Sequence, residues 1–300
     1  MSKKPVLDSF YEVVEELCKE LYVKALKDLP PDVREAIKKA YESEQSETGK
    51  QVLSTMLENI GVADNRNRLI CQDTGIPIYF VKVGNQLIID FVRLEEAIIK
   101  GCQRATVEHP LRSSVVSPFK RENNQNSSGY RIPSIHYDVV QNNDKVEILM
   151  VPKGSGSENM SFLKMLIPAE GVRGVKRFIL ETVAQNIAAN PCPPYVVGIG
   201  IGGTADMCMK LAKTAAVTRP IGSRNPDPEM AAFEEEMFRS VNELGIGPMG
   251  LGGLNTAIAV NVEYAYTHIT QNPVAINMQC WPARRARATI SEDGQYQIGY

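Results

Sequence analysis

The chain has 300 residues, and its 33 lysine and arginine side chains nearly balance 35 aspartate and glutamate side chains, giving a formal net charge of −2 at pH 7. This balance argues against a protein that binds nucleic acid or anionic membranes through bulk charge. No apolar run approaches the roughly 18 residues of a membrane span, and acidic residues interrupt the N-terminal segment where a secretory signal needs an apolar core. We therefore expect an intracellular, cytoplasmic protein.

The order of apolar and polar residues predicts a mixed α and β chain. Residues 1–60 are expected to be helical, because apolar residues such as Val6, Phe10 and Val13 recur at helical spacing. Residues 61–300 alternate β-branched runs with helical stretches. The expected strands are 76–84, 85–92, 135–140, 145–152, 195–203, 255–268 and 272–280, and the expected helices include 93–108, 174–189 and 230–244. We predict an α/β fold with a helical segment packed on a mixed-sheet body, as one domain over 1–300 or as two lobes that meet near 155–175.

The six cysteines are scattered and do not form the compact framework of a small secreted domain. Three of them lie in helical patterns and are expected to be core or surface residues that do not bind a metal; these are Cys18, Cys102 and Cys208. The other three lie beside glycine or proline turns, where distant segments can converge; these are Cys71, Cys192 and Cys280. From the residues alone, a metal site and three unrelated cysteines are about equally favoured. The prolines beside Cys192 and Cys280 tip the balance toward an iron–sulfur site.

Arginine is the residue expected to bind a carboxylate substrate, because its guanidinium pairs both oxygens. Arg112 is one candidate, and the others form a trio after Cys280, namely Arg284, Arg285 and Arg287. In general such a trio is more often a solvated or subunit-facing charge run.

Two glycine-rich segments were considered as anion sites. In the first, Gly154 and Gly156 could present successive backbone N–H groups as an anion nest, although a plain surface turn is about equally favoured. The second, GIGIGG at 198–203, lacks the GxGxxG spacing of a dinucleotide site. We expect this second segment to pack a strand closely against the following helix and to anchor the turn that carries Cys192.

Five segments, in chain order, resemble a known family: CQDTG, PKGSGSENMS, NPCPPYVVGIGIGG, GIGPMGLGG and QCWPARRARATI. They are similar to the alpha subunit, or N-terminal half, of the class I iron–sulfur fumarate hydratases, the family to which L-tartrate dehydratase also belongs. The match runs from about residue 46 to residue 290. Five ordered motifs over this length are specific, whereas each alone would be weak.

The resemblance implies a [4Fe–4S] cluster held by Cys71, Cys192 and Cys280, with the fourth iron left for substrate. Gln72 and Asp73 match family positions that contact the substrate and its leaving hydroxyl. We expect Asp73 to be catalytic on this basis.

Three further roles follow from the resemblance. Arg112 matches a carboxylate-binding arginine, and the loop with Gly154 and Gly156 matches one whose backbone N–H holds a carboxylate, for which we favour Gly156. His268 lies twelve residues before Cys280 (280 − 268 = 12), as does a family histidine that reaches the substrate. We expect His268 to be catalytic as well.

The resemblance also implies a partner and a reaction. The base that removes the substrate proton lies in the C-terminal half of family members, so we expect a separate beta subunit, a hetero-oligomer and little activity of this chain alone. The expected reaction is the reversible hydration of fumarate to L-malate (EC 4.2.1.2), a step of the tricarboxylic acid cycle. L(+)-Tartrate is the second choice and mesaconate a third.

Two alternatives outside hydro-lyase chemistry remain open at this point. One is a closed structural zinc site made by Cys71, Cys192, Cys280 and His268. The other is a redox sensor or electron carrier that uses the cluster without binding a dicarboxylate.

Overall fold

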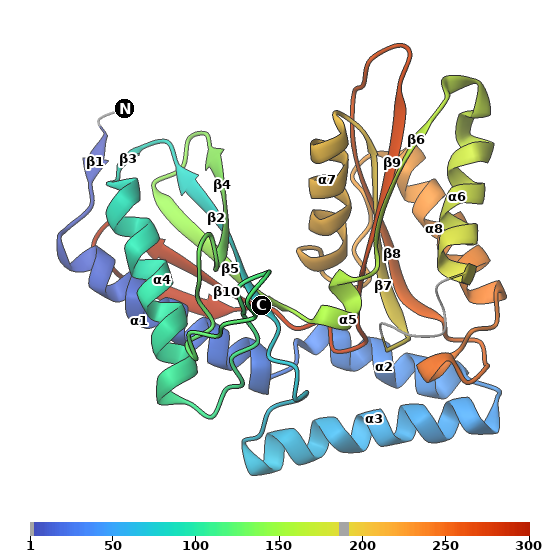
Figure 1. Cartoon of the computed structure of the whole chain (residues 1–300), viewed down its shortest axis with the longest axis horizontal. Coiled ribbons are helices and arrows are strands. Elements are labelled where there is room, and N and C mark those ends of the chain that lie inside the picture. Colours follow the sequence, from blue (N-terminus) through green and yellow to red (C-terminus); the bar gives the residue numbers. More distant parts are fainter. Residues whose placement is uncertain (1–2, 186–191) are drawn as a thin grey trace. The chain divides into compact units, whose positions relative to one another are not determined.

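The chain folds into two compact units, and Figure 1 shows the ribbon of both. The computed structural model describes residues 3–185 and 192–300. Unit 1 comprises residues 1–30, 63–154 and 284–300, and unit 2 comprises residues 31–62 and 155–283. Each unit has a mixed sheet with helices packed against it, so the prediction of an α/β fold is confirmed.

Unit 1 contains a five-stranded sheet with the strand order β11-β10-β5-β2-β4. Strand β4 is parallel to β2, and the other neighbours are antiparallel. Helices α1 and α4 pack against each other, and α1 covers β5 and β10 (Figure 1). The elements are β1 (Lys4–Pro5), α1 (Ser9–Lys27), β2 (Ile76–Gly84), β3 (Leu87–Ile88), α4 (Phe91–Glu108), β4 (Ser134–Val140), β5 (Lys145–Lys153), β10 (Ala286–Ser291) and β11 (Tyr296–Gly299).

The core of unit 1 follows from two periodicities. Helix α1 buries one stripe that includes Phe10 and Leu17, and β2 buries alternate side chains such as Tyr79 and Val81 against it. Two cysteines expected not to bind a metal, Cys18 and Cys102, lie in this cluster and are 0% exposed. Burial raises the pKa of both thiols, so both are poor metal ligands and that expectation is confirmed.

The expected strand over residues 85–92 is wrong in its second half. Only Leu87 and Ile88 form a strand, and α4 begins at Phe91. The reason is Asp90, whose carboxylate accepts hydrogen bonds from the backbone N–H groups of Val92 (2.9 Å) and Arg93 (3.3 Å). This N-cap satisfies donors of the first helical turn, and the local cap outweighs the β propensity of the apolar run.

Unit 2 contains a four-stranded sheet with the order β6-β9-β7-β8, in which only β7 and β8 are parallel. Helix α7 packs on one face, and α6 and α8 lie on the other (Figure 1). The elements are α2 (Pro31–Ser43), α3 (Glu47–Arg66, whose last turn belongs to unit 1), α5 (Ser155–Glu158), β6 (Ser161–Leu166), η1 (Pro168–Glu170), α6 (Gly171–Gln185), β7 (Tyr195–Gly202), α7 (Ala205–Val217), α8 (Pro228–Glu243), η2 (Pro248–Gly250), β8 (Ala257–Ala265) and β9 (Asn272–Gln279).

Strand β7 explains the alternating glycines of the GIGIGG segment. Val197 and Ile199 point into the apolar core beneath α6 and α8. Gly198 and Gly200 face α7, where an added Cβ would meet the backbone of that helix. A period of two in a strand therefore places large side chains on one face and none on the other, and the expectation of close strand-to-helix packing is confirmed. Cys208 on α7 is 0% exposed, as expected.

The expected helical segment over residues 1–60 is present as α1, α2 and most of α3, but it is not one bundle. Helix α1 belongs to unit 1 and α2 to unit 2. The expected helix over 174–189 is observed as α6 up to Gln185, and its last residues, 186–189, lie outside the described part of the chain. Within the described residues, no helix is both long and apolar enough to cross a membrane.

Candidate functional site

The first group of candidate residues lies in unit 1, in the segment that joins α3 to β2. The N–H of Ile70 donates to the C=O of Leu26 (3.0 Å), and Ile70 is 4% exposed, which fixes the chain just before Cys71. Thr74 is fully buried, and its hydroxyl donates to the C=O of Arg112. Cys71 is half-buried and free. The segment is thus held at both ends while its thiol remains accessible.

Asp73 closes a tight turn in this segment. Its Oδ1 accepts the N–H of Gly75 at 2.8 Å. Gly75 has φ +71°, and an added Cβ there would lie 2.7 Å from the backbone of Pro152. Only glycine combines that left-handed conformation with so close an approach, so the CQDTG motif needs its glycine for a structural reason.

Asp73, Gly154 and Arg284 converge at the end of β5. Arg284 donates from Nη1 to the C=O of Asp73 at 2.7 Å. A Cβ built on Gly154 would lie 3.2 Å from Oδ2 of Asp73 and 3.8 Å from Nη2 of Arg284. Arg284 is 4% exposed, and among the described residues its Nε has no hydrogen-bond partner. A carboxylate, a guanidinium and an open glycine backbone therefore meet at one place in unit 1.

Arg284 is expected to stabilise this group measurably. Arg284→Gln removes the charged donor to the Asp73 carbonyl and should lower the free energy of unfolding by about 2–3 kcal/mol. Arg287→Gln is the matched control: Arg287 is one-third exposed and 3.7 Å from Glu147, so its loss should cost less than about 1 kcal/mol. Urea unfolding of both variants measures the difference. A more stable Arg284→Gln variant would contradict this role and would indicate a guanidinium kept for a ligand at the expense of stability.

Three cations of unit 1 are buried, although the sequence patterns did not predict their burial. Arg284 and Arg285 are 4% and 3% exposed, so the interpretation of the trio as a solvated run is wrong for these two residues. Lys153, which directly precedes Gly154, is 0% exposed and was not considered at all. Charged side chains are buried only where partners compensate them. Their positions in the sequence were the available signal for burial: Arg284 and Arg285 directly precede β10, and Lys153 is the last residue of β5.

The remaining candidates of unit 1 are Gln72 and Arg112. Both side chains are exposed. The backbone of Arg112 is tied to Thr74 as described above, so the structure brings Arg112 beside the CQDTG segment. Their expected contacts with substrate stay predictions.

The second group of candidate residues lies in unit 2 and is centred on two cysteines. The N–H of Trp281 donates to the C=O of Cys192 at 3.1 Å, so Cys192 lies beside the residue that follows Cys280. Neither cysteine is part of a disulfide; Cys192 is exposed and Cys280 is half-buried. Burial, and then the charge of both cysteines, raise the pKa of Tyr195 to about 12. Cys192 and Cys280, hereafter the thiol pair, are therefore both close enough to Tyr195 to affect its pKa.

The glycine loop after β5 reaches the same end of unit 2. Ser157 is fully buried and its hydroxyl donates to the side-chain carbonyl of Gln279 at 3.1 Å. Gln279 directly precedes Cys280, and Ser157 directly follows Gly156. The structure thus brings Gly156 near the thiol pair, whereas Gly154 lies against Asp73 in unit 1.

His268 lies at the opposite end of β9 from the thiol pair. It is exposed in the loop that joins β8 to β9, where its Nδ1 lies 2.9 Å from the hydroxyl of Thr270. The eight residues of β9 separate it from Cys280, a span of about 26 Å for an extended strand. The structure therefore does not bring His268 to the thiol pair of its own chain. This geometry also excludes a closed zinc site that combines His268 with Cys280 of the same chain.

Among the described residues, no three His, Cys, Asp or Glu side chains gather as a metal site. Cys71 belongs to unit 1, and the thiol pair belongs to unit 2. Two accessible thiols on facing segments supply the soft donors that iron and zinc prefer.

Comparison with known proteins points to one group of enzymes. The model of the family described as "Fumarate hydratase (Fumerase)" matches residues 15–289. The chain is 46% identical to the putative L(+)-tartrate dehydratase subunit alpha of Methanocaldococcus jannaschii, over 92% of this chain and 97% of that protein. It is 35% identical to the L(+)-tartrate dehydratase subunit alpha of Escherichia coli K12, over 88% of this chain and 86% of that protein.

Proposed function

Because this chain belongs to the fumarate hydratase (Fumerase) family, we propose that it is the alpha subunit of a two-subunit hydro-lyase that interconverts fumarate and L-malate. The family match and the relatives named as dehydratase alpha subunits support the reaction class. The observation within the molecule that carries the proposal is the thiol pair, two accessible cysteines whose segments are joined by the hydrogen bond from the Trp281 N–H to the Cys192 C=O.

The donor set fits an iron–sulfur cluster. Cys71, Cys192 and Cys280 are the three cysteines that are not fully buried, whereas Cys18, Cys102 and Cys208 are. We propose that these three hold a [4Fe–4S] cluster. When bound, a cluster with three thiolate ligands supplies an open iron that acts as a Lewis acid toward the substrate hydroxyl.

The chain's own residues would bind and orient the dicarboxylate. The guanidinium of Arg112 is suited to pair one carboxylate through two parallel hydrogen bonds, and the N–H of Gly156 is a candidate donor to the same ligand. Asp73 would exchange a proton with the leaving hydroxyl, since its Oδ2 faces the open backbone of Gly154. We assign no step to His268 of the same chain, because β9 separates it from the thiol pair.

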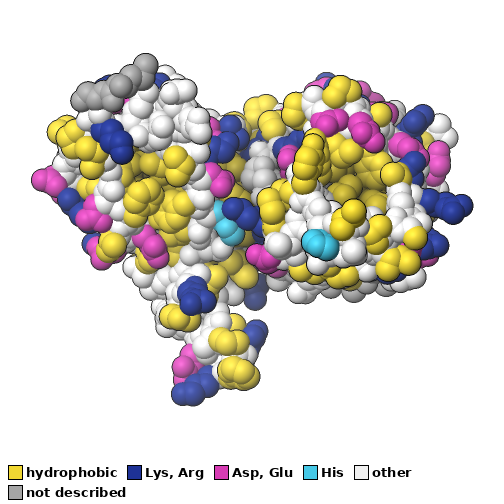
Figure 2. All heavy atoms as spheres, turned by 90° about the horizontal axis from the view of Figure 1, so that it is seen from above, with side chains coloured by type: hydrophobic (Ala, Val, Ile, Leu, Met, Phe, Trp, Pro, Cys, Tyr) yellow, Lys and Arg dark blue, Asp and Glu magenta, His cyan; other side chains and the backbone are white. Residues whose placement is uncertain are grey.

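A partner subunit is part of the proposal. The relatives are named as subunits alpha, and we propose a beta subunit that supplies the base. Broad hydrophobic areas cover the face shown in Figure 2. Separately, Tyr266 and Ile269 of the loop that joins β8 to β9 are 94% and 88% exposed. Apolar surface of this extent is typical of protein–protein contacts.

L(+)-Tartrate is the second candidate substrate, favoured by the names of the relatives. Tartrate differs from malate by one additional hydroxyl. A site built to hydrogen-bond that hydroxyl rejects the analogue that lacks it by several orders of magnitude, whereas a site without such a partner discriminates weakly. The two functions therefore predict different ratios of kcat/KM.

The test is anaerobic assay of the chain with its partner subunit on malate, L(+)-tartrate and mesaconate. We expect the highest kcat/KM on malate and little turnover by the chain alone. Iron and sulfide content, with electron paramagnetic resonance spectra with and without malate, tests the cluster. A spectrum that malate leaves unchanged would favour a redox sensor, and a higher kcat/KM on tartrate would replace the first candidate by the second.

A further inference from the structure

Glu44 lies just after α2, and its carboxylate is enclosed by hydrogen-bond donors. The residue is 2% exposed. Oε1 accepts the N–H groups of Gln45 (3.0 Å) and Ser46 (3.1 Å) in its own turn. It also accepts the N–H of Leu254 at 3.0 Å, while Oε2 accepts the N–H and the side-chain amide of Asn255 at 3.1 and 2.9 Å. Two segments far apart in the sequence thus bind one carboxylate.

The hydrogen-bond donors around Glu44, hereafter the cradle, favour an ionised carboxylate. Burial raises the pKa of Glu44, but hydrogen bonds from Asn255, Leu254 and Ser46 outweigh burial and hold the pKa at about 2. A Cβ on Gly49 would lie 2.9 Å from Cδ of Glu44, and a Cβ on Gly253 would lie 2.8 Å from its Oε1. Successive backbone N–H groups and glycine walls are the features of an anion nest, here filled by the chain's own side chain.

The cradle belongs to the GIGPMGLGG loop, whose two ends are joined. The N–H of Gly252 donates to the C=O of Ile246 at 2.8 Å, and the N–H of Gly247 donates to the hydroxyl of Thr256 at 3.2 Å. Because the loop is closed on itself, fixing its last residues also fixes its centre.

The same loop holds the segment that carries the thiol pair. Its central N–H, that of Met249, donates to the C=O of Pro193 at 3.1 Å. Its end is bonded as well, since the N–H of Tyr195 donates to the C=O of Thr256 at 2.9 Å. A continuous run of hydrogen bonds therefore leads from Glu44 through the loop to the residue after Cys192.

We propose that Glu44 is a positioning residue for the thiol pair: its carboxylate fixes the GIGPMGLGG loop, and the loop sets the spacing of Cys192 and Cys280. The inference rests on the proposed function, because it gives Glu44 a part in cluster binding. Nothing in the motif comparison pointed to Glu44, which lies outside all five segments.

The alternative is that Glu44 only fastens the α2–α3 turn and contributes to stability. The two roles differ in one observable. Substitution of a residue that only stabilises changes the free energy of unfolding but leaves the spacing of the thiols in folded molecules unchanged. Substitution of a positioning residue changes that spacing.

The test uses the full-length chain with its cluster removed and dibromobimane, which fluoresces after it has alkylated two neighbouring thiols. Peptide mapping identifies the bridged cysteines. In Glu44→Ala we expect bridging of Cys192 to Cys280 to be slower by about fivefold or more, and added formate, which can enter the vacated nest, to restore the rate. Iron and sulfide uptake on reconstitution should fall in parallel.

Two further variants separate positioning from stability. Val175→Ala removes buried side-chain volume from the core of unit 2, so it destabilises the same unit but removes none of the hydrogen bonds that link Glu44 to the thiol pair, and its bridging rate should be close to that of wild type. Gly49→Ala favours helix α3 by intrinsic propensity but crowds the carboxylate of Glu44. It should slow bridging without lowering the unfolding temperature.

The inference is overturned if Glu44→Ala bridges the two cysteines at the wild-type rate, or if its bridging rate is reduced no more than that of Val175→Ala. A failure of the proposed function is distinguishable. If the wild-type chain bridges Cys192 to Cys280 but takes up no iron and sulfide, cluster binding fails, while the comparison of bridging rates still decides whether Glu44 positions the pair.

Discussion

Cys280→Ser is expected to yield a folded chain that no longer retains an iron–sulfur cluster. Serine keeps the size of the side chain but replaces a soft thiolate by a hydroxyl that stays protonated at neutral pH. Structural zinc sites bind with about 10–16 kcal/mol shared among few ligands, and with a comparable share for each thiolate of the cluster, losing one ligand should reduce iron content by more than about tenfold. Iron and sulfide analysis after anaerobic reconstitution measures the loss.

Cys208→Ala is the matched control for this loss. Cys208 is fully buried on α7, with its Sγ 3.3 Å from the C=O of Gly200. Its removal should leave iron content at the wild-type level. Cys71→Ser and Cys192→Ser should behave as Cys280→Ser does. Wild-type iron content in any of the three serine variants would remove that cysteine from the proposed ligand set.

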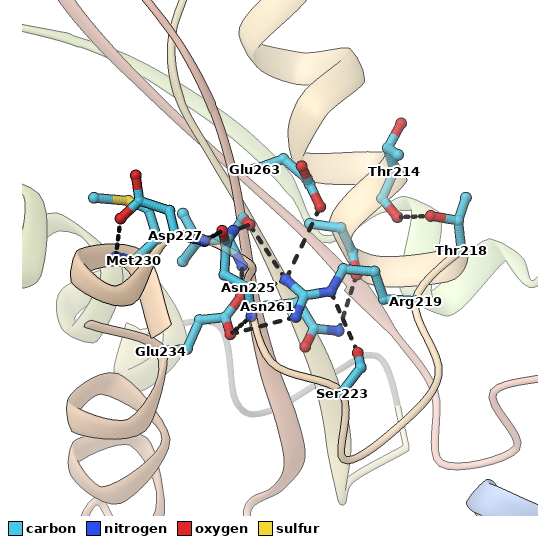
Figure 3. A network of polar contacts seen from close by, with 12 residues as sticks. Thr214, Thr218, Arg219, Ser223, Asn225, Asp227, Met230, Glu234, Asn261 and Glu263 are labelled. Carbon is cyan, nitrogen blue, oxygen red and sulfur yellow. Dashed lines mark hydrogen bonds and ion pairs between the residues drawn. The ribbon is translucent and has the colours of Figure 1, made fainter. Parts of the chain in front are cut away.

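Glu234→Ala is expected to destabilise unit 2 by about 3–5 kcal/mol, because it leaves a buried arginine with only the more distant Glu263, 3.9 Å away, as a counter-ion. Glu234 on α8 is 1% exposed and pairs with Arg219, which is 12% exposed (Figure 3). It also accepts the N–H groups of Val262 at 2.8 Å and Asn225 at 3.0 Å. Thermal unfolding followed by circular dichroism should show a large fall in the midpoint.

The network also protects an edge of the sheet. Strand β8 is at the end of the strand order, and the N–H of Val262 is satisfied by Glu234 while its C=O accepts the side-chain amide of Asn225 at 2.7 Å. Side chains that occupy edge groups hinder pairing with other chains. We therefore expect Glu234→Ala to aggregate more readily than wild type on heating.

Glu235→Ala, one residue further along α8, is the control for Glu234→Ala. Glu235 pairs with Arg224 at the surface, where both side chains are more than 40% exposed. Exposed pairs contribute about 0–1 kcal/mol, so this variant should unfold close to wild type. Equal effects of the two substitutions would show that burial of the Arg219–Glu234 pair is not what stabilises unit 2.

Local patterns were sufficient for most elements. The short β-branched run in residues 145–152 predicted β5, and the helical spacing in residues 93–108 predicted most of α4, because each signal lies within a single element. The wrong prediction for residues 85–92 also has a local cause. Asp90 is a helix N-cap, and such a residue within an apolar run indicates that a helix begins there.

The sequence by itself determined the α/β class, the helical positions of Cys18, Cys102 and Cys208, and the motifs that identify the family. Only the tertiary structure decided which polar residues are buried and which candidates meet. It enclosed Glu44, Arg284 and Lys153, and it set His268 at the far end of β9 from Cys280. The physical reason is that periodicity is a property of one segment, whereas burial, ion pairing and ligand spacing depend on contacts between segments far apart in the chain.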